Sequence, residues 1–343
     1  MNSLLILPGA ADASAGTSCK VIGQTKQVVT KKKTDYLICA LSGKRKIWKA
    51  TSAAVGTKAT VLSKRGLPFI DLALTVKNYS AQCVLVMSGS EVVAEWNFGS
   101  HTPSTKILVA SVSKSFTSAL VGIAQKKGFL DIDDKASRFI TEWTGTKSEP
   151  VTIRQLLAMT STRSDFNLIN ALQDARGQTI SDVRGGARHA SSPGLAWAYH
   201  NASTQALELV LSRSTGESVS AFAQRELFVK MGMTTTIEKD LKGVEMVFAG
   251  FMSTCRDVGK LTRLYLQKGN WNGEQILPEG WVRYTTTPAP AAERGEYGAQ
   301  WWLNAGAKDN PSDRNYPDLP TDTFLADGFE GQSVFVIPSK KLV

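Results

Sequence analysis

The pattern of apolar and polar residues predicts strands at the start of the main part of the chain, followed by a long helix. Two short apolar runs, Cys83–Met87 and Val92–Trp96, flank the turn residues Ser88-Gly89-Ser90, which is typical of a β-hairpin. Apolar residues then recur at helical spacing over about 111–127, and Gly128 ends this segment. The sequence therefore predicts a hairpin and then a helix with one buried face.

The rest of the chain contains further predicted helices and a closing group of strands. Thr152 and Gln155 have the spacing of a capping box, which opens a helix. Other predicted elements share a clear apolar period: helices over Thr204–Arg213, Val219–Met231 and Asp257–Gln267, and strands over Tyr297–Leu303, Thr323–Ala326 and Ser333–Ile337. Strands at both ends with helices between them predict an α/β (α+β) fold. We expect an antiparallel sheet formed by both chain ends, flanked by helices, with a mainly helical insertion.

Composition narrows the class of protein. The chain has 343 residues, of which 42% are hydrophobic and 20% charged, as in an ordinary globular protein with a sizeable core. These values exclude a disulfide mini-protein, a collagen-like fibre and a wholly disordered chain. No apolar run approaches 18 residues, so we expect no membrane span. Three scattered histidines and four distant cysteines predict no metal site, and nothing in the sequence indicates a cofactor.

The net charge of +10 belongs to the N-terminal part of the chain. Residues 1–66 contain twelve basic and two acidic residues, whereas residues 67–343 contain 28 of each. This distribution predicts an anionic surface such as a cell-wall polymer as a partner, and no nucleic acid bound by the main domain.

The first 66 residues divide into three predicted segments. Residues 1–15 end in an A-x-A cleavage pattern and are interpreted as the remnant of a secretory signal peptide, with a disordered N-terminus as the alternative. Residues 16–50 form a small basic module of two or three strands with a turn at Ser42-Gly43. Residues 51–66 are a polar linker, and residues 67–343 form the main domain. A secreted or cell-wall-associated protein follows from this interpretation.

Two cysteines lie in the small module and two in the main domain. A Cys19–Cys39 disulfide would close a short loop and stabilise a unit that is too small for a core of its own. This cysteine pair resembles that of small basic modules on secreted actinobacterial proteins. Cys83 and Cys255 lie in apolar or helical contexts and are expected to be buried thiols. Four cysteines allow three pairings, which the sequence leaves open.

Ser111 and Lys114 are the first candidates for catalysis. Positions i and i+3 share a face at the start of a helix, so the hydroxyl and the amine can meet. A lysine whose pKa is lowered can act as the base that makes a serine nucleophilic. The helix N-terminus also supplies N–H groups near a developing oxyanion. Alone, this spacing is also that of a capped helix with a surface lysine.

A second and a third motif follow along the chain. Tyr199 and Asn201 form a Tyr-x-Asn loop, in which the phenol can relay a proton and the amide can hold a substrate carbonyl. A third candidate group follows Gly328 and leads into a predicted strand. Glycines at such a place allow the backbone to approach a ligand closely. This substrate-binding group is Phe329, Glu330, Gly331 and Gln332, with the Gln332 N–H as a second oxyanion donor.

In this order, the three motifs and their context resemble the β-lactamase-related serine hydrolases: class C β-lactamases, their esterase relatives and 6-aminohexanoate-dimer hydrolases. The resemblance covers residues from about 67 to 343 and implies a β-lactamase/transpeptidase-like fold. It makes Ser111 the acylated nucleophile, Lys114 its base, Tyr199 the proton shuttle and Asn201 the substrate-positioning amide. The family continues beyond Val343 into another strand and a helix, so a truncated C-terminus is expected.

The third motif departs from the family. Penicillin-recognising members carry Lys-Thr-Gly, whereas this chain has Phe329-Glu330-Gly331. The cation that would meet a substrate carboxylate is absent, which favours an esterase or amidase acting on a small-molecule ester or amide. A D,D-peptidase or penicillin-binding enzyme is the alternative within the family. A catalytically idle wall-binding protein is the alternative from another class.

Overall fold

The computed structural model describes residues 25–30, 33–42, 45–50, 60–61, 69–77, 81–181 and 192–343. Backbone contacts divide the chain into two compact units, Met1–Thr105 and Lys106–Val343. The predicted signal remnant, Cys19 and Gly43 lie outside the described residues, as does most of the predicted linker.

The first unit contains two three-stranded antiparallel sheets. The first sheet has the order β1-β2-β3 and confirms the predicted strands of the small module: β1 (Thr25–Thr30), β2 (Lys33–Ser42) and β3 (Arg45–Ala50). The second has the order β4-β6-β5 and contains the predicted hairpin: β4 (Thr60–Val61), β5 (Cys83–Ser88) and β6 (Glu91–Asn97). A helix that the sequence pattern did not predict, α1 (Ile70–Lys77), precedes this hairpin.

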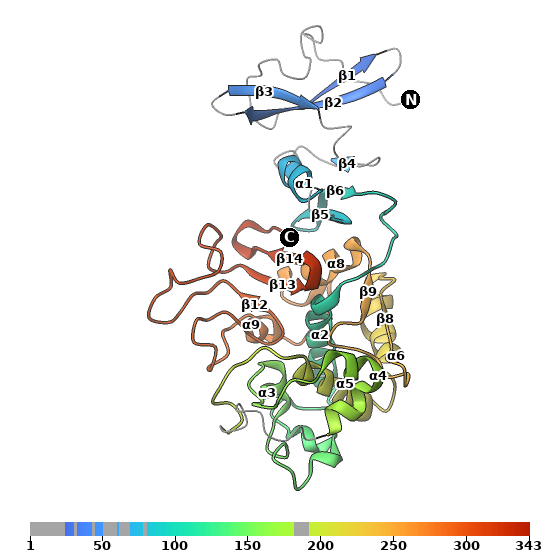
Figure 1. Cartoon of the computed structure of the whole chain (residues 1–343), viewed down its shortest axis with the longest axis vertical. Helices are drawn as coiled ribbons and strands as arrows, with labels where there is room; N and C mark the ends of the chain where they lie inside the picture. Colours follow the sequence, from blue (N-terminus) through green and yellow to red (C-terminus); the bar gives the residue numbers. More distant parts are fainter. Residues whose placement is uncertain are drawn as a thin grey trace. The chain divides into compact units, whose positions relative to one another are not determined.

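The second unit has more residues in helices than in strands (Figure 1). Its helices are α2 (Ser113–Lys126), α3 (Ile153–Leu157), α4 (Leu168–Ile180), α5 (Asn201–Thr215), α6 (Val219–Ala223), α7 (Val229–Met231), α8 (Cys255–Leu266) and α9 (Trp281–Thr285). A π-helical turn over Gln224–Phe228 connects α6 to α7, where the sequence predicts one continuous helix. The predicted capping box of α3 is present in both directions, from Thr152 and from Gln155.

Strands of the second unit form three small antiparallel sheets. Their orders are β7-β9-β8, β10-β11 and β12-β13-β14. The bounds are β7 (Ile107–Leu108), β8 (Thr236–Ile237), β9 (Phe251–Ser253), β10 (Asn270–Trp271), β11 (Glu274–Gln275), β12 (Trp302–Leu303), β13 (Phe324–Gly328) and β14 (Gln332–Val336). The prediction of one sheet formed by both chain ends is wrong in its pairing, because the strands of the two ends belong to separate hydrogen-bonded sheets.

Helix α2 is the central helix of the second unit, and residues 113–124 are all buried (Figure 1). On its apolar side, the ring of Phe116 stacks on the ring of Phe251 in the core, with ring centroids 5.0 Å apart. Its buried hydroxyls donate to backbone carbonyls outside the helix: Ser115 to Gln300, and Ser118 to Ala299. A helix rich in serine and threonine can therefore be buried on all sides without losing hydrogen bonds.

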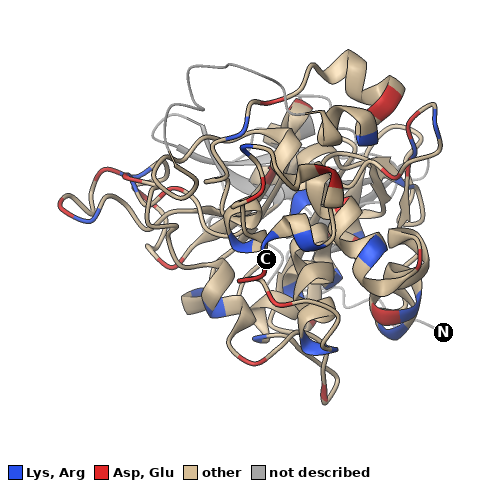
Figure 2. Ribbon diagram, turned by 90° about the horizontal axis from the view of Figure 1, so that it is seen from below, with Lys and Arg blue, Asp and Glu red and all other residues tan. Residues whose placement is uncertain are grey.

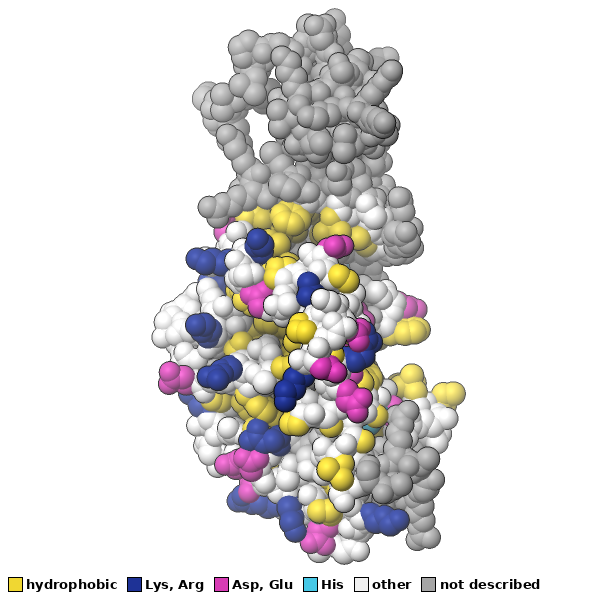
Figure 3. All heavy atoms as spheres, turned by 90° about the vertical axis from the view of Figure 1, so that its left-hand side faces the viewer, with side chains coloured by type: hydrophobic (Ala, Val, Ile, Leu, Met, Phe, Trp, Pro, Cys, Tyr) yellow, Lys and Arg dark blue, Asp and Glu magenta, His cyan; other side chains and the backbone are white. Residues whose placement is uncertain are grey.

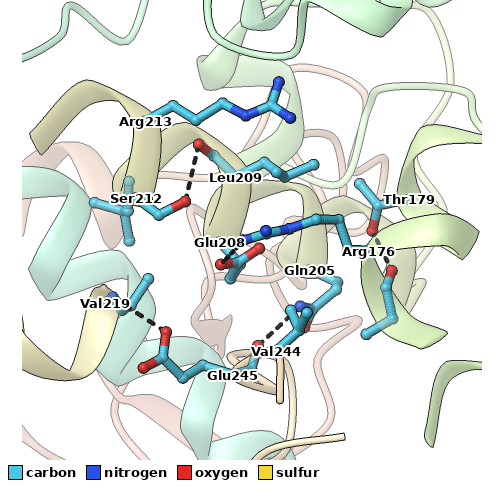
Figure 4. Close-up of polar contacts among 12 residues, drawn as sticks. Arg176, Thr179, Gln205, Glu208, Leu209, Ser212, Arg213, Val219, Val244 and Glu245 are labelled. Carbon is cyan, nitrogen blue, oxygen red and sulfur yellow. Dashed lines mark hydrogen bonds and ion pairs between the residues drawn. The ribbon is translucent and has the colours of Figure 1, made fainter. Parts of the chain in front are cut away.

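Helix α5 is held beyond its first turn by a polar cluster that includes the buried Gln205 and Glu208 (Figure 4). Arg176 of α4 donates to the carboxylate of Glu208 at 2.8 Å. Gln205 donates to the carbonyl of Glu245, whose carboxylate accepts the N–H of Val219 at the start of α6. These bonds join α4, α5 and α6, and so fix the helix that begins at Asn201.

The cysteines of the main domain differ from the expectation. Cys83 and Cys255 are both disulfide-bonded, so the prediction of buried thiols is wrong. Among the described residues, no helix is long and apolar enough to cross a membrane. Basic and acidic residues are interspersed on the described surface in both views of charge (Figures 2 and 3).

Candidate active site

Ser111 lies in a single 3₁₀ turn (Ala110–Val112) that leads directly into α2. The predicted contact is present: the Nζ of Lys114 donates to the Oγ of Ser111 at 2.9 Å. Ala110, immediately before the serine, has φ of 46°, a left-handed conformation that is strained for a residue with a Cβ. Strain of this kind is typical of a turn that presents a nucleophile, and Ser111 is half-buried rather than enclosed.

Lys114 is almost completely removed from solvent, with 2% of its side chain exposed. Its amine also donates to the Oδ1 of Asn201 at 2.8 Å and to the carbonyl of Phe248 at 2.9 Å. Burial lowers the pKa of Lys114 from 10.5 to about 7, against the opposing effect of the Asp165 carboxylate. All three hydrogen bonds of the amine are to neutral oxygens, so the charge of a protonated Lys114 is offset only in part by Asp165, and an uncharged amine is accessible near neutral pH.

Tyr199 and Asn201 lie beside the lysine, as the sequence predicts for a shared site. The Nζ of Lys114 is 5.0 Å from the centroid of the Tyr199 ring. Burial raises the pKa of Tyr199 to about 12, although its hydrogen bond with Ser111 acts in the opposite direction. Near neutral pH the site therefore holds a phenol that keeps its proton beside an amine that can lose one.

An aromatic cluster orients the phenol. The ring of Tyr199 stacks on Trp302 at 5.1 Å and meets Tyr297 edge-on at 5.9 Å. Trp197 contacts both of these partners. The N–H of Ala198 donates to the carbonyl of Met159, which fixes the loop backbone next to the tyrosine. Sequence reasoning missed this cluster, because its members lie about one hundred residues apart.

Asp165 is a second feature that sequence reasoning missed. Its Oδ1 accepts the N–H groups of Asn201 at 2.8 Å and Ala202 at 3.0 Å, at the first turn of α5. A helix start needs acceptors for its free N–H groups, but no sequence signal shows that the acceptor is 36 residues away. The carboxylate raises the pKa values of both Lys114 and Tyr199.

The third motif lies at the end of β13 and in the turn that follows it. Gly328, at the end of β13, is the residue that approaches the Ser111 turn, because an added Cβ would lie 2.6 Å from the carbonyl oxygen of Val109. Phe329, Glu330 and Gly331 form an exposed turn beyond the strand, with Phe329 79% exposed and Glu330 at φ of 63°.

Among the described residues, no hydrogen bond or ring contact joins this exposed turn to the catalytic candidates Ser111, Lys114 and Tyr199, or to the substrate-positioning candidate Asn201. Gln332 begins β14, where it pairs with Gly328. The structure therefore brings together Ser111, Lys114, Tyr199 and Asn201. Of the third motif, Gly328 at the end of β13 is the residue that lies against the turn carrying Ser111.

Over residues 69–77, 81–181 and 192–343, no group of three or more His, Cys, Asp or Glu side chains is placed to hold a metal ion. The site consists of a hydroxyl, an amine, a phenol and an amide, which are the groups of acyl transfer.

Comparisons with known proteins bear on the family and the fold of the chain. A family model described as Beta-lactamase matches residues 76–343. The chain is similar to the 6-aminohexanoate-dimer hydrolase of Paenarthrobacter ureafaciens, with 25% identity over 294 residues that cover 77% of this chain and 74% of that protein.

Two solved structures show the same fold. One is EstCE1, a hydrolase with promiscuous acyltransferase activity, at a TM-score of 0.63 and 16% identity, covering 78% of this chain and 88% of that chain. The other is the octameric penicillin-binding protein homologue from Pyrococcus abyssi, at a TM-score of 0.61 and 18% identity, covering 79% and 70%.

Proposed function

The chain belongs to the Beta-lactamase family, and from this premise we propose that it cleaves an ester or amide through an acyl-enzyme on Ser111. One observation carries the proposal: the Ser111 hydroxyl accepts a hydrogen bond from a buried lysine amine whose pKa is lowered to about 7. A neutral amine in this position is a base within reach of the hydroxyl proton.

The reaction divides the proton transfers between two residues. Lys114 takes the proton of Ser111 as the Oγ forms a bond to the substrate carbonyl carbon. The leaving group departs with the phenolic proton of Tyr199, and the Lys114 ammonium then returns a proton to the phenolate. In deacylation the proton transfers run in reverse, beginning with the return of the phenolic proton to Lys114. A water molecule attacks the acyl carbon and gives its proton to the phenolate of Tyr199, and the ammonium of Lys114 returns a proton to the Oγ of Ser111 as the acid product is released.

Backbone N–H groups supply the oxyanion site in this proposal. The first donor is the N–H of Ser111, for which no hydrogen-bond partner is found among the described residues. The second donor is the N–H of Gln332. Gln332 is the partner of Gly328 in the strand pair, and Gly328 lies against the Ser111 turn. Two such donors stabilise the charge that develops on the carbonyl oxygen.

An esterase or amidase fits the described charges better than a D,D-peptidase. The segment from Asn315 to Ser339, which contains β13 and β14, has four acidic residues and no lysine or arginine. A substrate carboxylate therefore has no cation to pair with on this strand edge. Secretion or attachment to the cell wall, through the basic module of residues 16–50, is part of the same proposal.

The test compares two serine substitutions. Ser111→Ala removes the nucleophile and is expected to abolish hydrolysis of short-chain 4-nitrophenyl esters. Ser312→Ala changes an exposed serine in the same unit and is the matched control, expected to retain the parent rate. If Ser111→Ala hydrolyses these esters as fast as the parent, the proposed function is wrong.

A further inference from the structure

The end of β13 lies against the turn that carries the nucleophile. The absence of a Cβ at Gly328 allows its backbone to approach the carbonyl of Val109, and the Cβ of Ala110 lies on the same side. Any side chain would collide with this turn, so glycine sets the distance between the strand and Ser111. The residue just before Gly328 is therefore placed at the margin of the proposed active site.

That residue is Asp327, whose carboxylate is only partly engaged. It is the exposed position in a strand whose other residues are buried. Its Oδ1 accepts the hydroxyl of Ser333, its neighbour across the strand pair, at 2.5 Å. No described residue donates to its other oxygen, so the serine fixes the carboxylate and leaves one oxygen for a ligand.

The charge of Asp327 reaches the catalytic groups. It is one of the two carboxylates that raise the pKa of Tyr199, and the other is Asp165. It acts in the same way on Tyr316, which packs edge-on against Phe335 of β14. Glu330, the acidic residue of the third motif, is not among the charges that act on either phenol.

No described lysine or arginine forms an ion pair with Asp327, whose hydrogen-bond partner is the Ser333 hydroxyl. Between Arg314 and Lys340 the chain contains no lysine or arginine. The only cation described within the site is Lys114, which is buried and bonded to three neutral oxygens. An exposed carboxylate whose charge acts on Tyr199, and which forms no ion pair with a described residue, is a recognition element for a positively charged group.

We propose that Asp327 binds an ammonium group of the substrate, so that the enzyme prefers esters or amides that carry a primary amine near the scissile bond. This specificity rests on the proposed function. It gives this role to Asp327 and not to Glu330, because the end of β13 lies against the Ser111 turn, whereas Glu330 lies in the exposed turn after the strand.

The experiment uses the full chain and three matched 4-nitrophenyl esters, whose acyl chains end in an ammonium, an N-acetylamine or a carboxylate. We expect kcat/KM for the ammonium ester to exceed that for the N-acetyl ester by about tenfold at low salt, the order expected for one charged hydrogen bond. The carboxylate ester should be the slowest of the three. The ratio should fall as salt is added, because Asp327 is exposed.

Three substitutions assign the effect to one residue. Asp327→Asn retains an acceptor for Ser333 but removes the charge, and should reduce the ratio to about one. Asp318→Asn removes an exposed acid from the same segment and should retain the ratio, as should Glu330→Gln. The ratio within one variant does not depend on how much of it is folded, which protects the test against partial unfolding.

The outcomes separate this inference from the proposed function. If no ester is hydrolysed and Ser111 is not acylated, the proposed function is wrong. If the N-acetyl ester is hydrolysed but the ammonium ester is no better, the inference about Asp327 is overturned. The same holds if Asp327→Asn retains the preference, or if Glu330→Gln is the variant that loses it.

Discussion

The lowered pKa of Lys114 has a direct consequence for the pH dependence of acylation. The pKa falls from 10.5 to about 7 because the amine is buried. This shift of roughly 3.5 units corresponds to about 5 kcal/mol that favours the neutral amine relative to an exposed lysine. The neutral fraction is then about 1% at pH 5, 10% at pH 6 and 90% at pH 8, so kcat/KM should rise about tenfold per pH unit below 7 and level off above it.

The assay measures kcat/KM for an uncharged ester between pH 5 and pH 9. Asp165→Asn provides a second, independent test, because the Asp165 carboxylate raises the pKa of Lys114. Asparagine retains the oxygen that accepts the N–H groups of Asn201 and Ala202. With the charge removed, the pKa of Lys114 should fall further and the midpoint should move to lower pH.

Two results would refute this reasoning. A kcat/KM that is flat from pH 5 to pH 9, or that inflects near 10, would show that Lys114 is not the base with a lowered pKa. A midpoint that moves to higher pH in Asp165→Asn would contradict the electrostatic account. Lys114→Arg serves as the control that keeps a cation at every pH, and it should show little activity across the range.

Three further predictions concern the surroundings of the site. Trp302→Ala removes the ring stacked on Tyr199 and should lower kcat about tenfold, with rescue by Trp302→Phe, and steady-state kinetics would check both. Burial raises the pKa of Glu208 in the folded state, so ionisation of this carboxyl lowers the stability of the parent as the pH rises from the unfolded-state to the folded-state pKa. The stability of Glu208→Gln, measured by chemical denaturation, should therefore increase relative to that of the parent between pH 4 and pH 7. A difference in stability that stays constant over this range would contradict the prediction. Deletion of residues 16–50 should abolish salt-sensitive retention on cell walls in a sedimentation assay, and equal retention without them would exclude the module as the binder.

Local patterns predicted the elements that carry the catalytic candidates. The capping box at Thr152, the hairpin from Cys83 and the contact between Ser111 and Lys114 depend on residues close in sequence, and all are present. Helix α5 begins at Asn201, three residues earlier than the apolar period indicates, because His200 accepts the N–H of Ser203. Short-range geometry alone is sufficient for these features.

Features that depend on tertiary packing could not be predicted in this way. The approach of Gly328 to the Ser111 turn requires two segments more than 200 residues apart, and the exposed turn after it carries the more conspicuous glycine pattern. The cap that Asp165 provides for α5 has no local signature. The disulfide bonds of Cys83 and Cys255 were missed because an apolar context favours a buried thiol and a disulfide equally.

The central claim is that Ser111 is a nucleophile activated by a neutral Lys114. Labelling of the full chain with a fluorophosphonate at pH 8, followed by peptide mapping, tests this most directly. The account predicts a single adduct on Ser111, whose formation slows about tenfold for each pH unit below 7 and is lost in Lys114→Met. An adduct on another serine, or labelling of Ser111 at the same rate in the parent and in Lys114→Met, would contradict it.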